Sequence, residues 1–496
     1  MGLAPWAAAQ APAAVPSAQT LAARIDQFIA RPQFAHARWG IAVRSLDSGK
    51  VLYTHAADKL FVPASNAKLF TTALALADLG PDTRIATTLY ATSLRVNAAG
   101  VLHGNLILYG RGDPSLGLPK ASPDWAERMA AAVAALGVKR IKGNLIADAT
   151  YFKGIPVGAG WEANDLQSWY GAVPSALDVD GNLLHVTVTR EGRRCCAVSA
   201  TPDAADVHVA NLTATDPDVP LGLYRPPGSS TLYAIGHLPG SARRQVYALS
   251  MPRPALAAGN LLRQALARHR IRLTGHVRVV RWPQPDPALR GAGTHAIASV
   301  DSPTIAALVV HTLKNSDNLF AQSLLLQVGA AAAQRHACCA PTAPHTSVGW
   351  GLCALHDLLA KAGIPPGSVR LVEGSGLARE DLVAPNALVQ WLTWTATQPW
   401  GTNLRDALPV GGVDGTLQAR FRDGRGTNNV QAKTGTLSHI YTLTGFVTDA
   451  AHERLVFSIL LNGYPRWAVA SEDPDAGSPQ HALDTVARML ASYGAH

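Results

Sequence analysis

Apolar side chains recur at helical spacing in several segments of this 496-residue chain. Leu21, Ile25, Phe28 and Ile29 lie on one face of a turn of 3.6 residues, which predicts an amphipathic helix over residues 19–30. Similar spacing, combined with capping residues and glycine or proline stops, predicts the other helices. These cover about 65–79, 123–137, 255–269, 304–313, 319–333, 351–362, 386–397 and the segment from 478 onward.

Runs of alternating or continuous apolar residues predict strands between these helices. Residues 39–46 and 51–53 flank a tight turn, and residues 438–448 and 454–461 flank another, so each pair predicts an antiparallel hairpin. Between about 155 and 240 the chain is rich in Gly, Pro, Asp and Ser with short β-prone pieces, which predicts a small all-β insertion. Further strands are expected within 84–109, 141–152 and 275–281.

Composition indicates a globular protein. Hydrophobic residues make up 48% and charged residues 16%, and the length predicts two to four domains. The longest apolar-leaning stretch, 324–333, is interrupted by Gln327 and is far shorter than the roughly 18 residues of a membrane span, so no transmembrane segment is expected.

The net charge of +9 favours anionic partners. The arginines are spread along the chain and no zinc-finger, RNP or recognition-helix signature occurs, so nucleic acid is not expected as a partner. The charge therefore predicts a weak attraction to an anionic matrix.

Residues 1–18 are rich in Ala and Pro. They resemble the last third of a secretory signal but lack its basic region, so a signal remnant and a disordered arm both stay open.

Five cysteines occur as the adjacent pairs Cys195-Cys196 and Cys338-Cys339, plus Cys353. Adjacent cysteines rarely bond to each other, so the expected bridge joins the two pairs or joins Cys339 to Cys353. The Cys and His residues of 336–356 match no standard zinc spacing, and no metal is expected.

Ser65 and Lys68 lie one helical turn apart at the start of the helix expected over 65–79. A serine hydroxyl is a poor nucleophile until a base takes its proton, and a lysine serves as that base only if its pKa falls below about 10.4. The same pattern is also common as a serine N-cap followed by a solvated lysine.

Two further motifs follow in order, Ser316-Asp317-Asn318 between two predicted helices and Lys433-Thr434-Gly435 before the last hairpin. Acyl transfer from an amide needs a nucleophile, a proton path, oxyanion donors and a cation for a substrate carboxylate. In this interpretation Ser65 attacks, Lys68 takes its proton, and Ser316 relays a proton to the leaving nitrogen.

The remaining motif residues bind the substrate in this interpretation. Asn318 holds the substrate and Lys68, and Lys433 adds positive charge that keeps Lys68 neutral and attracts a carboxylate, with Thr434 beside it. Gly435 allows close approach, and the backbone N–H groups of Ser65 and Thr436 are the expected oxyanion donors. No organic cofactor is required.

The ordered trio of motifs is typical of penicillin-recognising serine enzymes. Its spacing, with 251 residues (316 − 65) between the first two motifs, resembles the class C low-molecular-mass penicillin-binding proteins, the D-alanyl-D-alanine carboxypeptidase/endopeptidases of bacterial cell walls. Stretches that also carry this resemblance are 108–116, 161–167, 373–379, 408–417 and 432–439.

The resemblance implies an α+β fold: an antiparallel sheet flanked by helices, with two smaller inserted domains, one nested in the other. Residues 19–83 and 297–496 would form the transpeptidase-like catalytic domain. Residues 84–155 and 240–296 would form the first insert, and 156–239 the nested, mainly β insert.

The resemblance also implies that Asp165, Tyr170 and Arg379 bind the side chain of the diamino acid in the stem peptide. Without it, Asp165 would be read as a turn residue, and Arg379 equally as a structural ion-pair partner. Two departures are Glu373, where Asp is commoner, and Ile440, which follows the Lys-Thr-Gly motif and bears on side-chain selectivity.

The sequence therefore predicts a periplasmic serine DD-peptidase that cleaves D-alanyl-D-alanine stem peptides and cross-bridges of peptidoglycan through a Ser65 acyl-enzyme. β-Lactams are expected to acylate the same serine, and a homodimer is a further expectation. The alternatives are a β-lactamase, for which Glu373 is a poor deacylation base, and a non-catalytic wall-binding scaffold.

Overall fold

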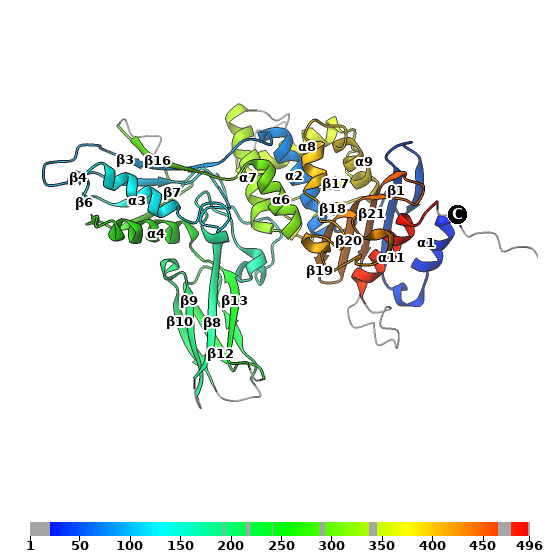
Figure 1. Ribbon diagram of the computed structural model, residues 1–496, viewed down its shortest axis with the longest axis horizontal. Coiled ribbons are helices and arrows are strands. Elements are labelled where there is room, and N and C mark those ends of the chain that lie inside the picture. Colours follow the sequence, from blue (N-terminus) through cyan, green and yellow to red (C-terminus); the bar gives the residue numbers. More distant parts are fainter. Residues whose placement is uncertain are drawn as a thin grey trace, which may run out of the picture.

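The structure is a computed structural model that describes residues 20–191, 194–214, 219–240, 242–287, 293–336, 345–464 and 478–494. The predicted arm of residues 1–18, and Cys338 and Cys339, lie outside the described residues. Figure 1 shows three parts: a sheet with helices on both faces, a second sheet with two helices, and a bundle of narrow strands that extends from the second sheet.

The first sheet has five antiparallel strands in the order β19-β20-β21-β1-β2. Its strands come from both ends of the chain: β1 (Arg38–Ser45), β2 (Val51–His55), β19 (Gln431–Leu437), β20 (Ile440–Thr448) and β21 (Arg454–Asn462). The two predicted hairpins are both present, and β21 joins them by pairing with β1.

Successive side chains of a strand point to opposite faces of the sheet, so these strands contribute to two separate hydrophobic cores. Ile41 and Phe457 pack under α1 (Leu21–Ile29) and α11 (Pro479–Ala491), whereas Ala42 and Val456 face the opposite helical layer. The helices of that layer are α2 (Lys68–Leu79), α6 (Ile305–Asn315), α7 (Asn318–Arg335), α8 (Ser347–Lys361), α9 (Pro385–Thr395) and α10 (Gly401–Asp406).

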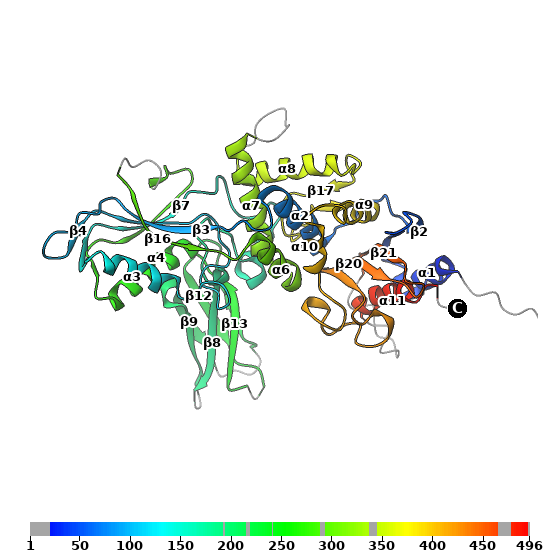
Figure 2. The same cartoon turned by 45° about the horizontal axis from the view of Figure 1, so that its top comes forward.

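Helix α7 is buried over most of its length, because it lies between the other helices of this layer and the inserted segment. Figure 2 shows α2, α6 and α7 in this central position. No helix of the described residues is both apolar enough and long enough to span a bilayer.

The inserted segment contains a second five-stranded sheet in the order β15-β7-β5-β3-β16 and a small sheet in the order β14-β6-β4. Its helices α3 (Trp125–Ala135) and α4 (Pro254–Arg268) pack on each other and share one core with these strands. The strands are β3 (Ala86–Ala91), β4 (Val101–His103), β5 (Leu106–Tyr109), β6 (Arg140–Lys142), β7 (Leu145–Ala149), β14 (Arg272–Leu273), β15 (Val277–Arg281) and β16 (His295–Asp301).

Residues 183–250 form two three-stranded sheets, ordered β13-β8-β9 and β10-β12-β11. The strands are β8 (Leu183–Glu191), β9 (Arg194–Thr201), β10 (His208–Thr213), β11 (Gly222–Tyr224), β12 (Thr231–Gly236) and β13 (Arg244–Ser250). Because β13 pairs along its whole length with β8, this β unit continues past residue 240.

The cysteine prediction was wrong in one respect. Cys195 and Cys196 are bonded to each other on β9, so the adjacent pair is a disulfide of its own. Neighbouring cysteines seldom bond because their geometry is restrictive, and sequence reasoning therefore set this pairing aside.

Candidate active site

Ser65 lies in a 3₁₀ turn (Ala64–Ala67) that leads directly into α2, so the helix expected from residue 65 begins three residues later, at Lys68. The turn is anchored to β20 at two points. Thr442 donates from its hydroxyl to the Pro63 carbonyl at 2.9 Å, and Asn66 donates to Thr444 Oγ1 at 2.7 Å. In a 3₁₀ turn residues i and i+3 nearly eclipse, which places Lys68 directly beside Ser65.

Lys68 is fully buried, and its Nζ lies 2.9 Å from Ser65 Oγ. The same nitrogen hydrogen-bonds to Asn318 Oδ1 and, at 2.7 Å, to the Ser375 carbonyl. Burial lowers the pKa of Lys68 to about 8, although the charges of Glu373 and Asp317 act in the opposite direction. The structure thus supplies the depressed pKa that a lysine base requires.

Lys433, on β19, is the second fully buried lysine of the site. Its Nζ donates to Ser316 Oγ at 2.8 Å and to the Thr434 carbonyl at 2.7 Å. Burial, with a smaller contribution from the charge of Lys68, lowers its pKa well below the usual value. Repulsion therefore disfavours the state in which both ammonium groups are charged.

The Ser316-Asp317-Asn318 segment is the tight junction between α6 and α7. Ser316 ends α6 in the left-handed conformation (φ 57°), and Asp317 caps α7 by accepting from the Phe320 N–H at 3.2 Å. This reversal directs Ser316 toward Lys433 and Asn318 toward Lys68, while Asp317 turns toward His311. The five predicted catalytic residues thus meet in two linked groups, Ser65–Lys68–Asn318 and Ser316–Lys433.

The Lys-Thr-Gly strand passes very close to the serine turn. A Cβ at Gly435 would lie 2.1 Å from Thr442 Oγ1 and 3.0 Å from the Pro63 carbonyl oxygen, so only glycine fits. Thr434 donates its hydroxyl to Thr416 Oγ1 at 2.8 Å, and Thr436 is exposed at the open side of the strand. The strand edge next to Ser65 is therefore available to a substrate.

The turn that begins at Glu373 supports Lys68. The sequence analysis considered this turn only as part of the family resemblance. The buried Glu373 carboxylate accepts from the backbone N–H groups of Ser375, at 2.6 Å, and of Gly376 and Leu377. These bonds fix the Ser375 carbonyl that contacts Lys68. The signal in the sequence is the Glu-Gly-Ser-Gly run itself, because two glycines and an acidic residue favour a tight turn.

The three residues predicted for the diamino-acid side chain lie in one region of the structure. Tyr170 is bound through its backbone, since its carbonyl accepts from Asn318 Nδ2 at 2.9 Å, and its side chain is 37% exposed. Arg379 pairs with Glu162 at 3.1 Å and donates to the Ser438 carbonyl at 3.3 Å.

Asp165 is nearly buried and accepts from the Glu162 N–H at 3.0 Å. Desolvation raises its pKa, while hydrogen bonding to Tyr170 and the charge of Arg379 lower it. The loop 161–170 and Arg379 thus form one wall beside the serine.

Residues 21–488 match the model of the D-Ala-D-Ala carboxypeptidase 3 (S13) family. A D-alanyl-D-alanine carboxypeptidase from Actinomadura sp. (strain R39) is 30% identical over 487 residues, which cover 95% of this chain and 84% of that protein.

Two crystal structures of penicillin binding protein 4 from Haemophilus influenzae share the fold. One has a TM-score of 0.80 at 24% identity, covering 95% of this chain and 99% of that one. The other, complexed with a β-lactam, has a TM-score of 0.75 at 23% identity, covering 94% and 98%. The predicted α+β fold is confirmed by this likeness.

Proposed function

Since this chain belongs to the D-Ala-D-Ala carboxypeptidase 3 (S13) family, we propose that it hydrolyses D-alanyl-D-alanine peptides through an acyl-enzyme on Ser65. The observation that carries this proposal is the buried Lys68 amine at 2.9 Å from Ser65 Oγ, in a setting that lowers its pKa to about 8.

Acylation begins when neutral Lys68 takes the proton of Ser65 as Oγ attacks the carbonyl carbon between the two D-alanines. The backbone N–H groups of Ser65 and Thr436 stabilise the oxyanion. Collapse of the tetrahedral intermediate breaks the C–N bond, and the leaving nitrogen receives a proton through Ser316, which Lys433 orients at 2.8 Å. Water then hydrolyses the ester, which releases the acyl product and returns Ser65 to its hydroxyl form and Lys68 to its neutral form.

The substrate backbone lies along the open edge of β19 in this proposal. Asn318 contacts the acyl portion, and the terminal carboxylate lies near Lys433, Thr434 and Gly435, where a positive charge and a hydroxyl are available. The wall of Asp165, Tyr170 and Arg379 receives the diamino-acid side chain, with Arg379 available to an anionic group once it leaves Glu162.

The β-lactamase alternative is disfavoured by the position of Glu373. A deacylation base must reach a water molecule beside the ester, but this carboxylate is fully buried and holds three backbone N–H groups. A β-lactam is thus expected to act as a slowly hydrolysed substrate mimic. A non-catalytic scaffold would have no use for two buried lysines, each of which is costly to desolvate.

We also propose the division into a catalytic domain and two nested inserts. The core shared by α3, α4 and the second sheet supports the first insert, and the pairing of β13 with β8 moves the end of the nested insert to about residue 250. Peptidoglycan as the natural substrate, a periplasmic location and a homodimer belong to the same proposal.

Covalent labelling with penicillin tests the proposed nucleophile. We expect one adduct per chain in intact-mass spectra, located at Ser65 by peptide mapping and absent in Ser65→Ala. A matched control is Ser438→Ala, in the neighbouring turn, which should keep the adduct. An adduct that persists in Ser65→Ala, or no adduct in the native protein, would contradict the proposal.

A further inference from the structure

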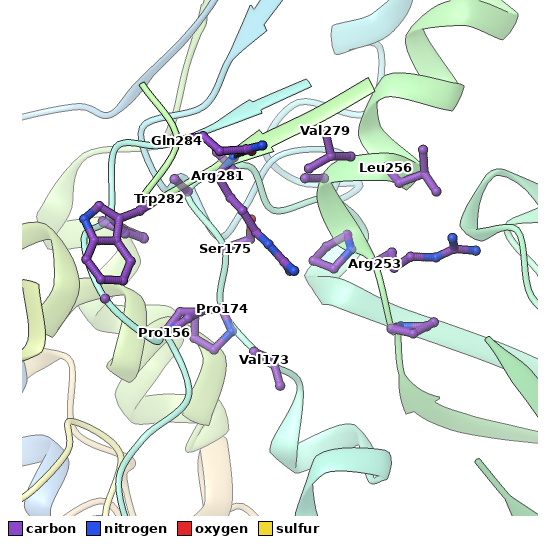
Figure 3. A pocket seen from close by; sticks show the side chains of 17 residues that line it. Pro156, Val173, Pro174, Ser175, Arg253, Leu256, Val279, Arg281, Trp282 and Gln284 are labelled. Atoms are coloured by element: carbon purple, nitrogen blue, oxygen red, sulfur yellow. Dashed lines mark hydrogen bonds between the residues drawn. The ribbon is translucent and has the colours of Figure 1, made fainter. Parts of the chain in front are cut away.

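A cavity of about 550 Å³ lies beside the first insert, outside the catalytic site. It is bounded by the end of β15, the start of α4 and the segments 149–156 and 173–176 (Figure 3). Four prolines, Pro156, Pro174, Pro252 and Pro254, form parts of its wall. Proline restricts the backbone, so these walls are largely preformed.

Two arginines line this cavity, and they differ in their partners. Arg253 pairs with Asp206 at 2.8 Å, so its charge is compensated, whereas Arg281 forms no ion pair with any of the described residues. Figure 3 shows the Arg281 side chain extending across the middle of the cavity, whereas the Arg253 side chain extends away from it. The guanidinium of Arg281 is thus the group available to a ligand.

An apolar surface accompanies this charge. The Trp282 indole also lines the cavity and is 41% exposed, and the apolar lining includes Val173, Leu256 and Val279. A half-exposed indole next to a free guanidinium is suited to a ligand that has a flat or ring-shaped apolar body and a carboxylate.

The segment of the sequence that supplies both cavity arginines is strongly positive. Residues 240–296 contain ten arginines and no lysine, against a single acidic residue, Asp286, so this segment carries the chain's entire excess of nine positive charges. Arginines are therefore denser in this stretch of the sequence than along the chain as a whole, and both arginines that line the cavity belong to it. A positively charged segment of this kind favours an anionic ligand.

The cavity is also close to the catalytic site along the chain. The Tyr170 carbonyl is bound by Asn318, and Val173, only three residues later, lines the cavity. Three residues span at most about 10 Å, so the cavity wall begins within that distance of the residue that Asn318 binds, and one polymer strand can reach both places. A second connection runs through Gln322, which binds the Pro156 carbonyl and the Gly374 N–H.

We propose that this cavity is a second peptidoglycan-binding site, in which Arg281 binds a stem-peptide carboxylate and Trp282 contacts the adjoining sugar or alkyl group. The identity of this ligand depends on the substrate proposed above, and the cavity itself takes no part in the chemical reaction. Its effect is to hold polymeric substrate near Ser65, so it matters for wall polymer and is irrelevant to small substrates.

The test compares Arg281→Ala with Arg278→Ala on two substrates. Arg278 lies on the same strand, is exposed and does not line the cavity, so its substitution removes the same charge outside the site. For Arg281→Ala we expect kcat/KM on insoluble cross-linked peptidoglycan to fall about three- to tenfold, the usual effect of losing one partly solvated charge-assisted hydrogen bond. Hydrolysis of a soluble diacetyl-Lys-D-Ala-D-Ala tripeptide and the rate of penicillin acylation should be unchanged.

The outcomes separate this inference from the proposed function. Equal losses in the two arginine variants on peptidoglycan would mean that only diffuse charge matters, and an unchanged Arg281→Ala would mean that the cavity is unused; either result overturns the inference. A loss on all substrates by Arg281→Ala would also overturn it, because the arginine would then support the catalytic site. Failure of the native protein to react with penicillin would instead contradict the proposed function.

Discussion

The protonation state of Lys68 sets the pH dependence of acylation, because only the neutral amine can accept a proton. Its pKa is lowered by burial to about 8. Below that pH the neutral fraction falls about tenfold per unit, so we expect the second-order rate constant of penicillin acylation to rise with pH and level off above about pH 8. Stopped-flow measurements between pH 6 and 9.5 check this profile.

Two carboxyl groups near Lys68 provide variants that test whether Lys68 sets the pH dependence of acylation. Glu373 and Asp381 together hold one negative charge that raises the pKa of Lys68, so the double variant Glu373→Gln/Asp381→Asn should move the rise to lower pH. Desolvation and Glu373 raise the pKa of Asp381 to about 10, which makes this side chain neutral at working pH, so Asp381→Asn should leave the profile in place. A profile that is the same in native protein and in the double variant would show that Lys68 is not the titrating base.

At this scale, sequence reasoning identified residues but not all of their contacts. Ser65, Lys68, Ser316, Asn318 and Lys433 could be named because each belongs to a short motif with a fixed chemical role. The contact between Lys68 and the Ser375 carbonyl could not be predicted, since it depends on a turn 307 positions away along the chain. The ion pair of Arg379 with Glu162 was likewise one of two open alternatives.

Among the elements, the turn after Glu373 packs tightly against the serine turn. Gly376 has φ +79°, and a Cβ there would lie 1.9 Å from the Ala64 carbonyl oxygen. We expect Gly376→Ala to lower the free energy of unfolding by about 2 kcal/mol or more, from left-handed strain and steric overlap, and to slow penicillin acylation by displacing Ser65.

Gly367→Ala is the control for backbone strain alone. Gly367 has a similar φ of +81°, but nothing lies within 4 Å of its Cβ position. This variant should lose about 1 kcal/mol and acylate normally. Equal acylation rates in the two alanine variants, measured alongside urea unfolding, would rule out the proposed contact between the turns.

Periodicity predicted most elements of the catalytic part, because amphipathic helices such as α1 and α11 and the β20–β21 hairpin carry strong local patterns. The 3₁₀ turn before α2 was missed, since its shape is set by Thr442 and Gly435 on the neighbouring strands rather than by its own residues. The parallel pairing of β10 with β12 could not be predicted either, because local sequence patterns do not show which strands pair.

At the scale of the whole molecule, Arg225 couples the nested β unit to the wall of the catalytic site. This arginine is 5% exposed and donates to the carbonyls of Leu166, Ser229 and Ser250, while its N–H donates to Gln167. We expect Arg225→Ala to loosen the loop 161–170 and to reduce kcat/KM on stem-peptide substrates about tenfold, with a smaller effect on penicillin acylation.

Arg190→Ala provides the comparison, because Arg190 also binds three carbonyls of the nested unit, those of Leu238, Gly240 and Ala242, but none of the site wall. Its peptide kinetics should stay within about twofold of native values. If both variants lose peptide activity equally, the effect would be a general loss of stability in the β unit, which thermal unfolding would reveal.

The pairing of β1 with β21 has a consequence for the order in which the enzyme becomes active. Ser65 and Lys68 are synthesised early, but Lys433, Gly435 and the strands that anchor the serine turn come from the last part of the chain. The site therefore cannot be complete until the residues of β19 and β20 are present. A chain interrupted anywhere before β19 therefore carries a nucleophile that it cannot use, so incomplete synthesis yields inert protein rather than an uncontrolled hydrolase.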